Sequence, residues 1–206
     1  RILRQTALSL QAQTSRDFEW VLVPNNGLLG AASALPFEDH GQPRSQDAGC
    51  WELLKPTLEG LTFPVRIVPF PEATNSIGAI KHFAFSQGQG DALVELDWDD
   101  LLTPDALERV ALEFKVGVAD FVYSNAAYFT GDFQPAKRFN PAGGWRWRPF
   151  TYQGHALDEI VSFDVSPASL LWIYFAPDHL RAWRRTFYET IGGHNPELPV
   201  ADDHEL

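Results

Sequence analysis

Asp91-Ala-Leu-Val-Glu-Leu-Asp-Trp-Asp-Asp100 is a short apolar run that ends in three acidic residues. The run from Ala92 to Leu96, interrupted only by Glu95, predicts a buried strand. Thr103-Pro104 follows and has the residue types of a helix N-cap and a first helical position. We therefore expect the acids to lie at the carboxyl end of a strand, which is the edge where open α/β sheets bind their ligands.

The three acids suggest a cation site. Side chains alternate along a strand, so Asp97 and Asp99 should point the same way and Trp98 the other way. Two carboxylates held close together repel each other unless a cation or a proton joins them. Hard oxygen ligands favour Mg²⁺ or Mn²⁺, which also bind waters and substrate phosphates. The alternative interpretation is a solvated acidic turn.

Apolar spacing outside this segment predicts alternating helices and strands. We expect helices through residue 13, around residues 51–54, from residue 75 to about residue 88, from residue 104, and over residues 177–185. We expect strands at residues 18–23, 65–68, 92–96, 121–124 and 170–175. This order predicts an α/β domain in which right-handed crossovers build a mostly parallel central sheet flanked by helices. Aromatic residues, Gly and Pro dominate from about residue 128 to residue 163, and a smaller mixed region is expected over residues 126–206.

Length and charge narrow the class of protein. A chain of 206 residues, 45% hydrophobic and 21% charged, fits one soluble globular domain. Its formal charge of −11 argues against a nucleic-acid partner. No apolar run is long enough to span a bilayer, so we expect no transmembrane segment and a cytoplasmic or membrane-peripheral location. A helix rarely opens such a domain, so we expect a first strand to precede residue 1.

An ordered set of motifs resembles the inverting family 2 glycosyltransferases of the GT-A fold. The set comprises a first helix containing Gln-Thr, a strand ending in a polar loop, Asn75 at a helix start, Leu96-Asp-x-Asp-Asp-x-x-x-Pro104, Ile191-Gly-Gly-His-Asn-Pro-Glu-Leu198 and Asp202-Asp-His-Glu-Leu206. The resemblance covers most of the chain. It implies a nucleotide-sugar donor, a divalent metal (Mn²⁺ or Mg²⁺) and a late carboxylate acting as general base. It also implies one GT-A domain over residues 1–206, with a nucleotide-binding half (1–125) and an acceptor-side half (126–206).

Family roles carry over to the acidic motifs by position. Asp97 and Asp99 match the family's Asp-x-Asp motif, which implies metal and donor binding. Asp202 and Asp203 match the late acidic pair, and we expect Asp203 to be the base, with Asp202 as the alternative. The alternative interpretation of this pair is structural: the two acids stand at a helix N-terminus, where the backbone dipole favours negative charge. His204 could be a further metal ligand, as a late His is in some GT-A enzymes, or an exposed helix-start residue.

The donor nucleotide is expected to be UDP. Family members usually have an acid after the second strand, whereas this chain has Asn25 and Asn26. An amide offers both a donor and an acceptor, as pairing with uracil requires. The other residues expected on the nucleotide side are Asn75, Lys81, Asp97 and Trp98.

The acceptor is expected to be a glycan, a lipid or a small molecule, because the sequence does not distinguish them. The Gly192-Gly193-His194 loop matches a family loop near the acceptor. Trp145 and Trp147 alternate with arginines, which fits either a sugar-stacking platform or an amphipathic edge strand. The resulting hypothesis is a metal-dependent, inverting glycosyltransferase that uses a UDP-sugar. The alternatives are a catalytically silent protein that binds UDP and metal and, less favoured, a metal-dependent phosphohydrolase.

Overall fold

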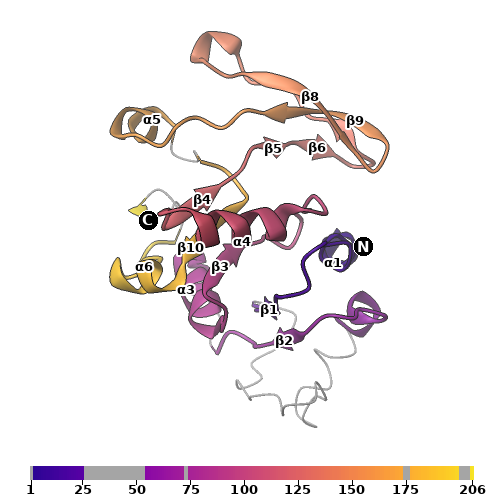
Figure 1. Ribbon diagram of the computed structural model, residues 1–206, viewed down its shortest axis with the longest axis vertical. Helices are drawn as coiled ribbons and strands as arrows, with labels where there is room; N and C mark the ends of the chain where they lie inside the picture. Colours follow the sequence, from indigo (N-terminus) through magenta and orange to yellow (C-terminus); the bar gives the residue numbers. More distant parts are fainter. Residues whose placement is uncertain (1, 26–53, 72–73, 174–176, 200–204) are drawn as a thin grey trace.

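The computed structural model describes residues 2–25, 54–71, 74–173, 177–199 and 205–206. Helices and strands alternate through the first part of the chain, and strands dominate the second (Figure 1). The helices are α1 (Ile2–Gln11), α3 (Ile77–Gln87), α4 (Ala106–Val116), α5 (Pro167–Trp172), α6 (Arg185–Thr190) and the 3₁₀ turn η1 (Pro141–Gly143). The strands are β1 (Trp20–Leu22), β2 (Val65–Ile67), β3 (Ala92–Glu95), β4 (Phe121–Tyr123), β5 (Ala126–Ala127), β6 (Phe129–Thr130), β7 (Gln134–Pro135), β8 (Trp147–Tyr152), β9 (His155–Ile160) and β10 (Arg181–Arg184).

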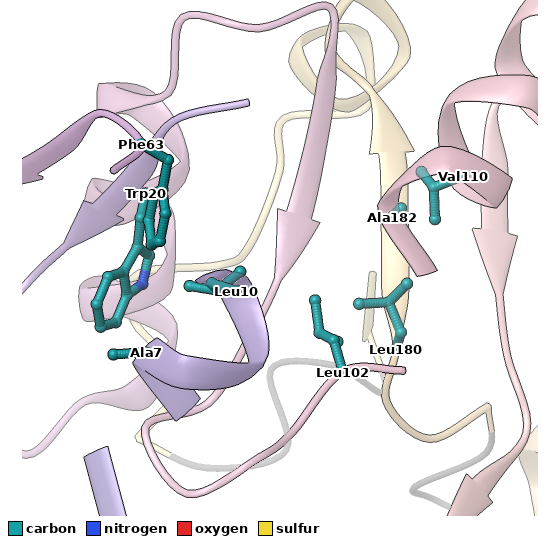
Figure 2. Packing of buried hydrophobic residues seen from close by; sticks show 8 residues of the cluster. All are labelled: Ala7, Leu10, Trp20, Phe63, Leu102, Val110, Leu180 and Ala182. Carbon is teal, nitrogen blue, oxygen red and sulfur yellow. The ribbon is translucent and has the colours of Figure 1, made fainter. Parts of the chain in front are cut away.

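The main core joins helices and strands of the first half of the chain to β10, which comes late in the sequence. It combines residues of α1, α4 and β10 with Trp20, Phe63 and Leu102 (Figure 2). Ala7 and Leu10 stand three positions apart on α1, so both face this core while the opposite side of the helix faces solvent. Burial of apolar side chains of this size is the main favourable term in folding, which explains why these three elements pack together.

The sheets are short, and they are parallel only in part. β1 and β2 pair in parallel. β10 lies between β3 and β4 and is antiparallel to both, with Ala182 opposite Val94 and Val122. β3 and β4 therefore run in the same direction without pairing with each other. The predicted α/β class is confirmed, but an antiparallel strand stands in the middle of this sheet.

A second antiparallel sheet forms the far end of the molecule in Figure 1. Its strand order is β5-β9-β8, and the β8–β9 hairpin turns at Gln153-Gly154, where both residues have positive φ. The hydroxyl of Tyr152 donates to the Leu102 carbonyl at 3.2 Å. This buried contact joins the second sheet to the loop that follows β3. None of the helices in the described part of the chain is long and apolar enough to cross a bilayer.

Most predicted elements are present, but two were wrong. Residues 170–172 belong to helix α5 and not to a strand, because Ser166 caps the helix start in a capping box with Ser169, and Pro167 stands in the first turn. The basic helix predicted over 177–185 is replaced by strand β10, whose side chains are largely buried. Pairing with strands on both sides outweighs the helical pattern there. Helix α4 also begins at Ala106, two residues later than its predicted start.

Candidate functional site

The acidic residues after β3 lie where the sequence places them. Asp97, Asp99 and Asp100, hereafter the acidic rim, occupy the turn that follows the carboxyl end of the strand. Asp99 is exposed, and the side chains of Asp97 and Asp100 are 43% and 40% exposed. The rim is thus open to a ligand from solvent, in keeping with the position of ligand sites in open α/β sheets.

Beneath the rim, the last residue of β3 is a buried carboxylate. Glu95 is 4% exposed and contacts three positively charged or protonatable side chains. Arg181 from β10 places Nη2 3.0 Å from Glu95 Oε1 and Nε 3.0 Å from Oε2. Lys81 from α3 forms an ion pair with the same carboxylate. The three elements that surround the site are therefore joined through one charged side chain.

His179 connects Glu95 to the acidic rim. Its Nε2 atom lies 3.3 Å from Glu95 Oε1 and 3.6 Å from Asp97 Oδ2. Its Nδ1 atom lies 3.0 Å from Asp100 Oδ2 and 3.6 Å from Asp178 Oδ1. The imidazole is therefore surrounded by carboxylates from two segments that are distant in the sequence.

The environment shifts the pKa values of these groups in opposite directions. Burial raises the pKa of Glu95, but the hydrogen bond from His179 and the charges of Arg181 and Lys81 outweigh it and hold the pKa well below its usual range. Burial lowers the pKa of His179, but its hydrogen bonds with Asp100 and Glu95 raise it to about 10. Burial raises the pKa of Asp97 above its usual value, against the opposing charges of His179 and Lys81. Near neutral pH, Glu95 is thus ionised and His179 protonated.

Three of these residues have the geometry of a metal site. Glu95, Asp97 and His179 each offer a ligand atom, and the three atoms lie within 4.8 Å of one another. Glu95 already binds Lys81 and Arg181, and these two fixed charges would repel a third cation. Asp97 is therefore the better carboxylate ligand, and His179 can bind a metal only after it loses its proton. Carboxylate oxygens such as those of Asp97 are the donors that Mn²⁺ and Mg²⁺ prefer.

Helix α1 holds the loop that carries the rim. The hydroxyl of Thr6 donates to the Trp98 carbonyl at 2.8 Å, and the Leu102 amide donates to Ser9 Oγ at 3.2 Å. Gln13 donates to the Thr103 carbonyl at 2.8 Å and accepts from the Leu107 amide at 3.0 Å. Thr6, Ser9 and Gln13 are each at most 1% exposed. The backbone N–H and C=O groups of this loop have no sheet partners, and buried side chains supply their hydrogen bonds instead. These bonds fix the path of the loop.

The residues predicted to bind the nucleotide occupy two regions. Asn25 follows β1, beside the end of β2, and Asn26 lies outside the described residues. Asn75 is exposed and precedes Ser76, whose hydroxyl caps α3 by accepting from the Ala79 amide at 3.1 Å. Lys81 reaches the carboxylate beneath the rim, and the Trp98 side chain is 60% exposed within the rim turn. The structure therefore brings Lys81 and Trp98 to the acids.

The residues predicted for catalysis and acceptor binding are only partly described. Asp202, Asp203 and His204 lie outside the described residues. Gly192 and Gly193 have φ angles of 90° and 66° and form the turn after α6. The His194 side chain is fully buried, and its Nδ1 atom lies 2.7 Å from the hydroxyl of Tyr188.

His194 and the remaining acceptor-side residue have different surroundings. The ring of His194 packs against Phe85 and Trp183, so its observed contacts are those of a core residue. Trp145 is partly buried beside the second sheet and lines a recess next to Asp178.

Sequence reasoning missed the residues that organise this cluster. Glu95, His179 and Arg181 were not among the expected site residues. A signal existed for Glu95, because a glutamate in an otherwise apolar strand must find a partner when it is buried. His179 and Arg181 lie in the segment whose secondary structure was predicted wrongly, so their position facing Glu95 was hidden.

Two comparisons bear on the fold and the family. Residues 45–176 match the model of "Glycosyl transferase family 2", which is more than half of the chain. The structure resembles that of S. aureus TarS, residues 1–349, with a TM-score of 0.57 and 15% sequence identity. The alignment covers 99% of this chain and 49% of the TarS chain, so this chain spans about half the length of its neighbour. No curated protein sequence matches the chain. The GT-A fold expected from the sequence is thereby confirmed, and the chain belongs to glycosyl transferase family 2.

Proposed function

We propose that this protein is a metal-dependent glycosyltransferase that moves a sugar from a UDP-sugar to a hydroxyl acceptor with inversion. The observation that carries the proposal is the acidic rim beside His179 and Lys81, at the carboxyl end of β3, in a member of glycosyl transferase family 2. Carboxylates, an imidazole and a lysine within one cluster suit a diphosphate that arrives together with a divalent cation.

The metal would be held at the rim. Asp97 and Asp99 are the proposed carboxylate ligands, with His179 beside them and His204 as a further candidate. A bound divalent ion stabilises negative charge on a departing diphosphate in place of a proton. Glu95 stays with Lys81 and Arg181 and serves to hold those two side chains near the rim. Lys81, 16% exposed, is the proposed contact to the phosphates.

The remaining roles follow from the family motifs. Asn25 and Asn26 are the proposed partners of the uracil edge. Asp203 is the proposed general base, which takes the proton of the acceptor hydroxyl as that hydroxyl attacks the anomeric carbon from the face opposite the leaving group. Asp202 is the second candidate for the base.

A catalytically silent protein that binds UDP and metal is the alternative function. The observation that favours it is Asn25 and Asn26 in place of the family's usual acid. Both functions predict binding, so only turnover separates them. Consumption of a UDP-sugar in the presence of Mn²⁺ that is lost in Asp203→Asn supports the enzyme, and loss in Asp202→Asn instead would assign the base to Asp202. Tight binding of UDP and Mn²⁺ without turnover against any acceptor pool supports the silent protein.

A thermal-shift panel of nucleotides and nucleotide sugars, with and without Mn²⁺, tests the binding step. Among the nucleotides without an attached sugar, we expect UDP with Mn²⁺ to give the largest increase in melting temperature. A ligand at one hundred times its Kd stabilises the folded state by about 2.7 kcal/mol, or roughly 5 to 10 °C for a chain of this length. Asp99→Ala should abolish the shift, whereas Asp91→Ala, an exposed acid at the other end of β3, should preserve it. An unchanged shift in Asp99→Ala would contradict the metal assignment.

A further inference from the structure

A recess lies between the second sheet and the segment that carries His179. Three aromatic side chains line it, Tyr128, Trp145 and Phe163, together with the polar side chains of Ser162 and Asp178. Its enclosed part has a volume of about 20 Å³, enough for one water molecule or one hydroxyl group. A larger ligand would therefore insert one substituent and lie across the aromatic side chains at the opening.

The polar side of the recess retains hydrogen-bonding capacity. The hydroxyl of Tyr128 donates to Asp178 Oδ2, and the His179 amide donates to Asp178 Oδ1 at 2.8 Å. Each carboxylate oxygen can accept about two hydrogen bonds, so each can accept one more. The hydroxyl of Ser162 donates to the Ser124 carbonyl at 2.6 Å, which leaves its oxygen able to accept. The recess therefore offers fixed acceptors to a ligand hydroxyl.

The aromatic side is held rigidly by ring packing. The centroid of Trp145 lies 4.9 Å from that of Phe163 and 4.6 Å from that of Phe139. Rings in these arrangements stabilise one another and hold the partly exposed indole in one orientation. A pyranose ring has an apolar face of C–H groups and a rim of hydroxyls. It matches an aromatic surface next to hydroxyl acceptors.

The recess also lies next to the acidic rim. Asp178 Oδ1 is 3.6 Å from His179 Nδ1, and that atom is 3.0 Å from Asp100 Oδ2. One imidazole ring thus separates the carboxylate of the recess from a carboxylate of the rim. A sugar in the recess would lie close to a diphosphate bound at the rim.

We propose that this recess is a pyranose-binding subsite. The sugar places one hydroxyl or hydroxymethyl group against Asp178 and its apolar face against Trp145. The sugar is either the one carried by the donor or one at the end of a saccharide acceptor, and in both cases its relation to transfer rests on the proposed function. The binding itself does not depend on turnover, so the two can fail separately.

Direct binding of methyl pyranosides tests the proposal. The probes are methyl glucoside, methyl galactoside and methyl N-acetylglucosaminide, detected by saturation-transfer-difference NMR with the full chain. Wild-type protein should bind at least one probe, and Trp145→Ala should weaken its binding about fivefold to tenfold, where tenfold corresponds to about 1.4 kcal/mol. Trp147→Ala is the matched control, because that indole stacks with Arg138 and does not line the recess.

Calorimetry with UDP, UDP-glucose and UDP-N-acetylglucosamine in the presence of Mn²⁺ identifies the source of the sugar. If the donor supplies it, a UDP-sugar binds more tightly than UDP, and Trp145→Ala removes that difference without changing the affinity for UDP. If the acceptor supplies it, UDP and UDP-sugars bind alike, and a methyl pyranoside still binds when UDP–Mn²⁺ is saturating.

Several outcomes overturn the proposal. One is that no methyl pyranoside binds and that UDP and UDP-sugars bind with equal affinity. Another is that Trp145→Ala and Trp147→Ala weaken pyranoside binding equally. If Trp145→Ala does not fold, Trp145→Phe keeps a ring and Asp178→Asn removes the charge, and at least one of them must weaken binding. Loss of UDP–Mn²⁺ binding with pyranoside binding intact would refute the proposed function and leave this subsite standing.

Discussion

Glu95→Gln is the most informative single change for the structure of the site. The carboxylate is 3% exposed and contacts Arg181, Lys81 and His179. The substitution keeps the size of the side chain and removes only its charge. Three positively charged groups would then surround a neutral amide, and Arg181, with a side chain 5% exposed, cannot reach solvent without disturbing β10.

The expected cost follows from this burial. Removing one partner of a buried ion pair costs about 3 to 5 kcal/mol, because the other charge is left uncompensated. Lys81 is 16% exposed and can turn toward water, so we expect the lower end, about 3 kcal/mol. For a chain of this length that corresponds to a fall in melting temperature of about 6 to 12 °C.

Urea unfolding of wild type, Glu95→Gln and Glu159→Gln at several pH values measures this cost. Glu159 is the matched control, because it pairs with Arg148, whose side chain is 60% exposed, and such pairs contribute about 0 to 1 kcal/mol. The folded-state pKa of Glu95 lies below its ordinary value of 4.5, so its ionisation stabilises the fold above that pH. The difference in unfolding free energy between wild type and Glu95→Gln should therefore be full near neutral pH and shrink as the pH falls below about 4.5.

Two results would refute this reasoning. One is a loss of less than about 1 kcal/mol in Glu95→Gln, which would place the pair among solvent-screened contacts. The other is a difference between wild type and variant that stays constant down to pH 3.

Three further predictions concern other parts of the fold. The ring of His179 should titrate near pH 10 in an NMR experiment. Its protonation should stabilise the fold fully below pH 6.5, and this stabilisation should be lost as the pH rises through about 10. A midpoint near 6.5 would contradict the hydrogen bonds described. Gln13→Ala removes three hydrogen bonds of a buried side chain and should cost about 2 kcal/mol in urea unfolding. Gln11→Ala, which removes two exposed side-chain hydrogen bonds, should cost less than about 1 kcal/mol; equal losses would refute the anchoring role of α1. Gly193→Ala places a Cβ 2.5 Å from the ring of Tyr188, whereas the Cβ of Gly192→Ala meets no atom within 4 Å. The melting temperature of the Gly193 variant should therefore fall well below that of the Gly192 variant. Similar melting temperatures would contradict the close approach.

Residues with local signals were predicted well from the sequence. The apolar run before Asp97 identified β3, and the apolar spacing after Asn75 identified α3. The position of the acidic rim followed, because the end of a strand determines which residues reach the sheet edge. These features depend on residues close together in the chain, so their pattern is visible without the fold.

Features that depend on distant contacts were not visible. The apolar spacing near Ala182 fits a helix, yet this segment is a strand because β3 and β4 supply hydrogen-bonding edges on both sides. His179 precedes that strand and meets Asp100 only because β10 lies beside β3. The hydrogen bonds of Gln13 to the loop after Asp100 likewise join segments about ninety residues apart. No local pattern reports such pairings.

The insertion of β10 between β3 and β4 has a consequence for biosynthesis. β4 leaves the ribosome with Tyr123, but the strand that joins it to β3 begins only at Arg181. Until that segment emerges, both strands have unpaired edges, and Glu95 lacks its arginine. This part of the nascent chain must therefore wait until the segment that begins at Arg181 has emerged before this sheet can close. Such non-local pairing slows folding and prolongs exposure to aggregation.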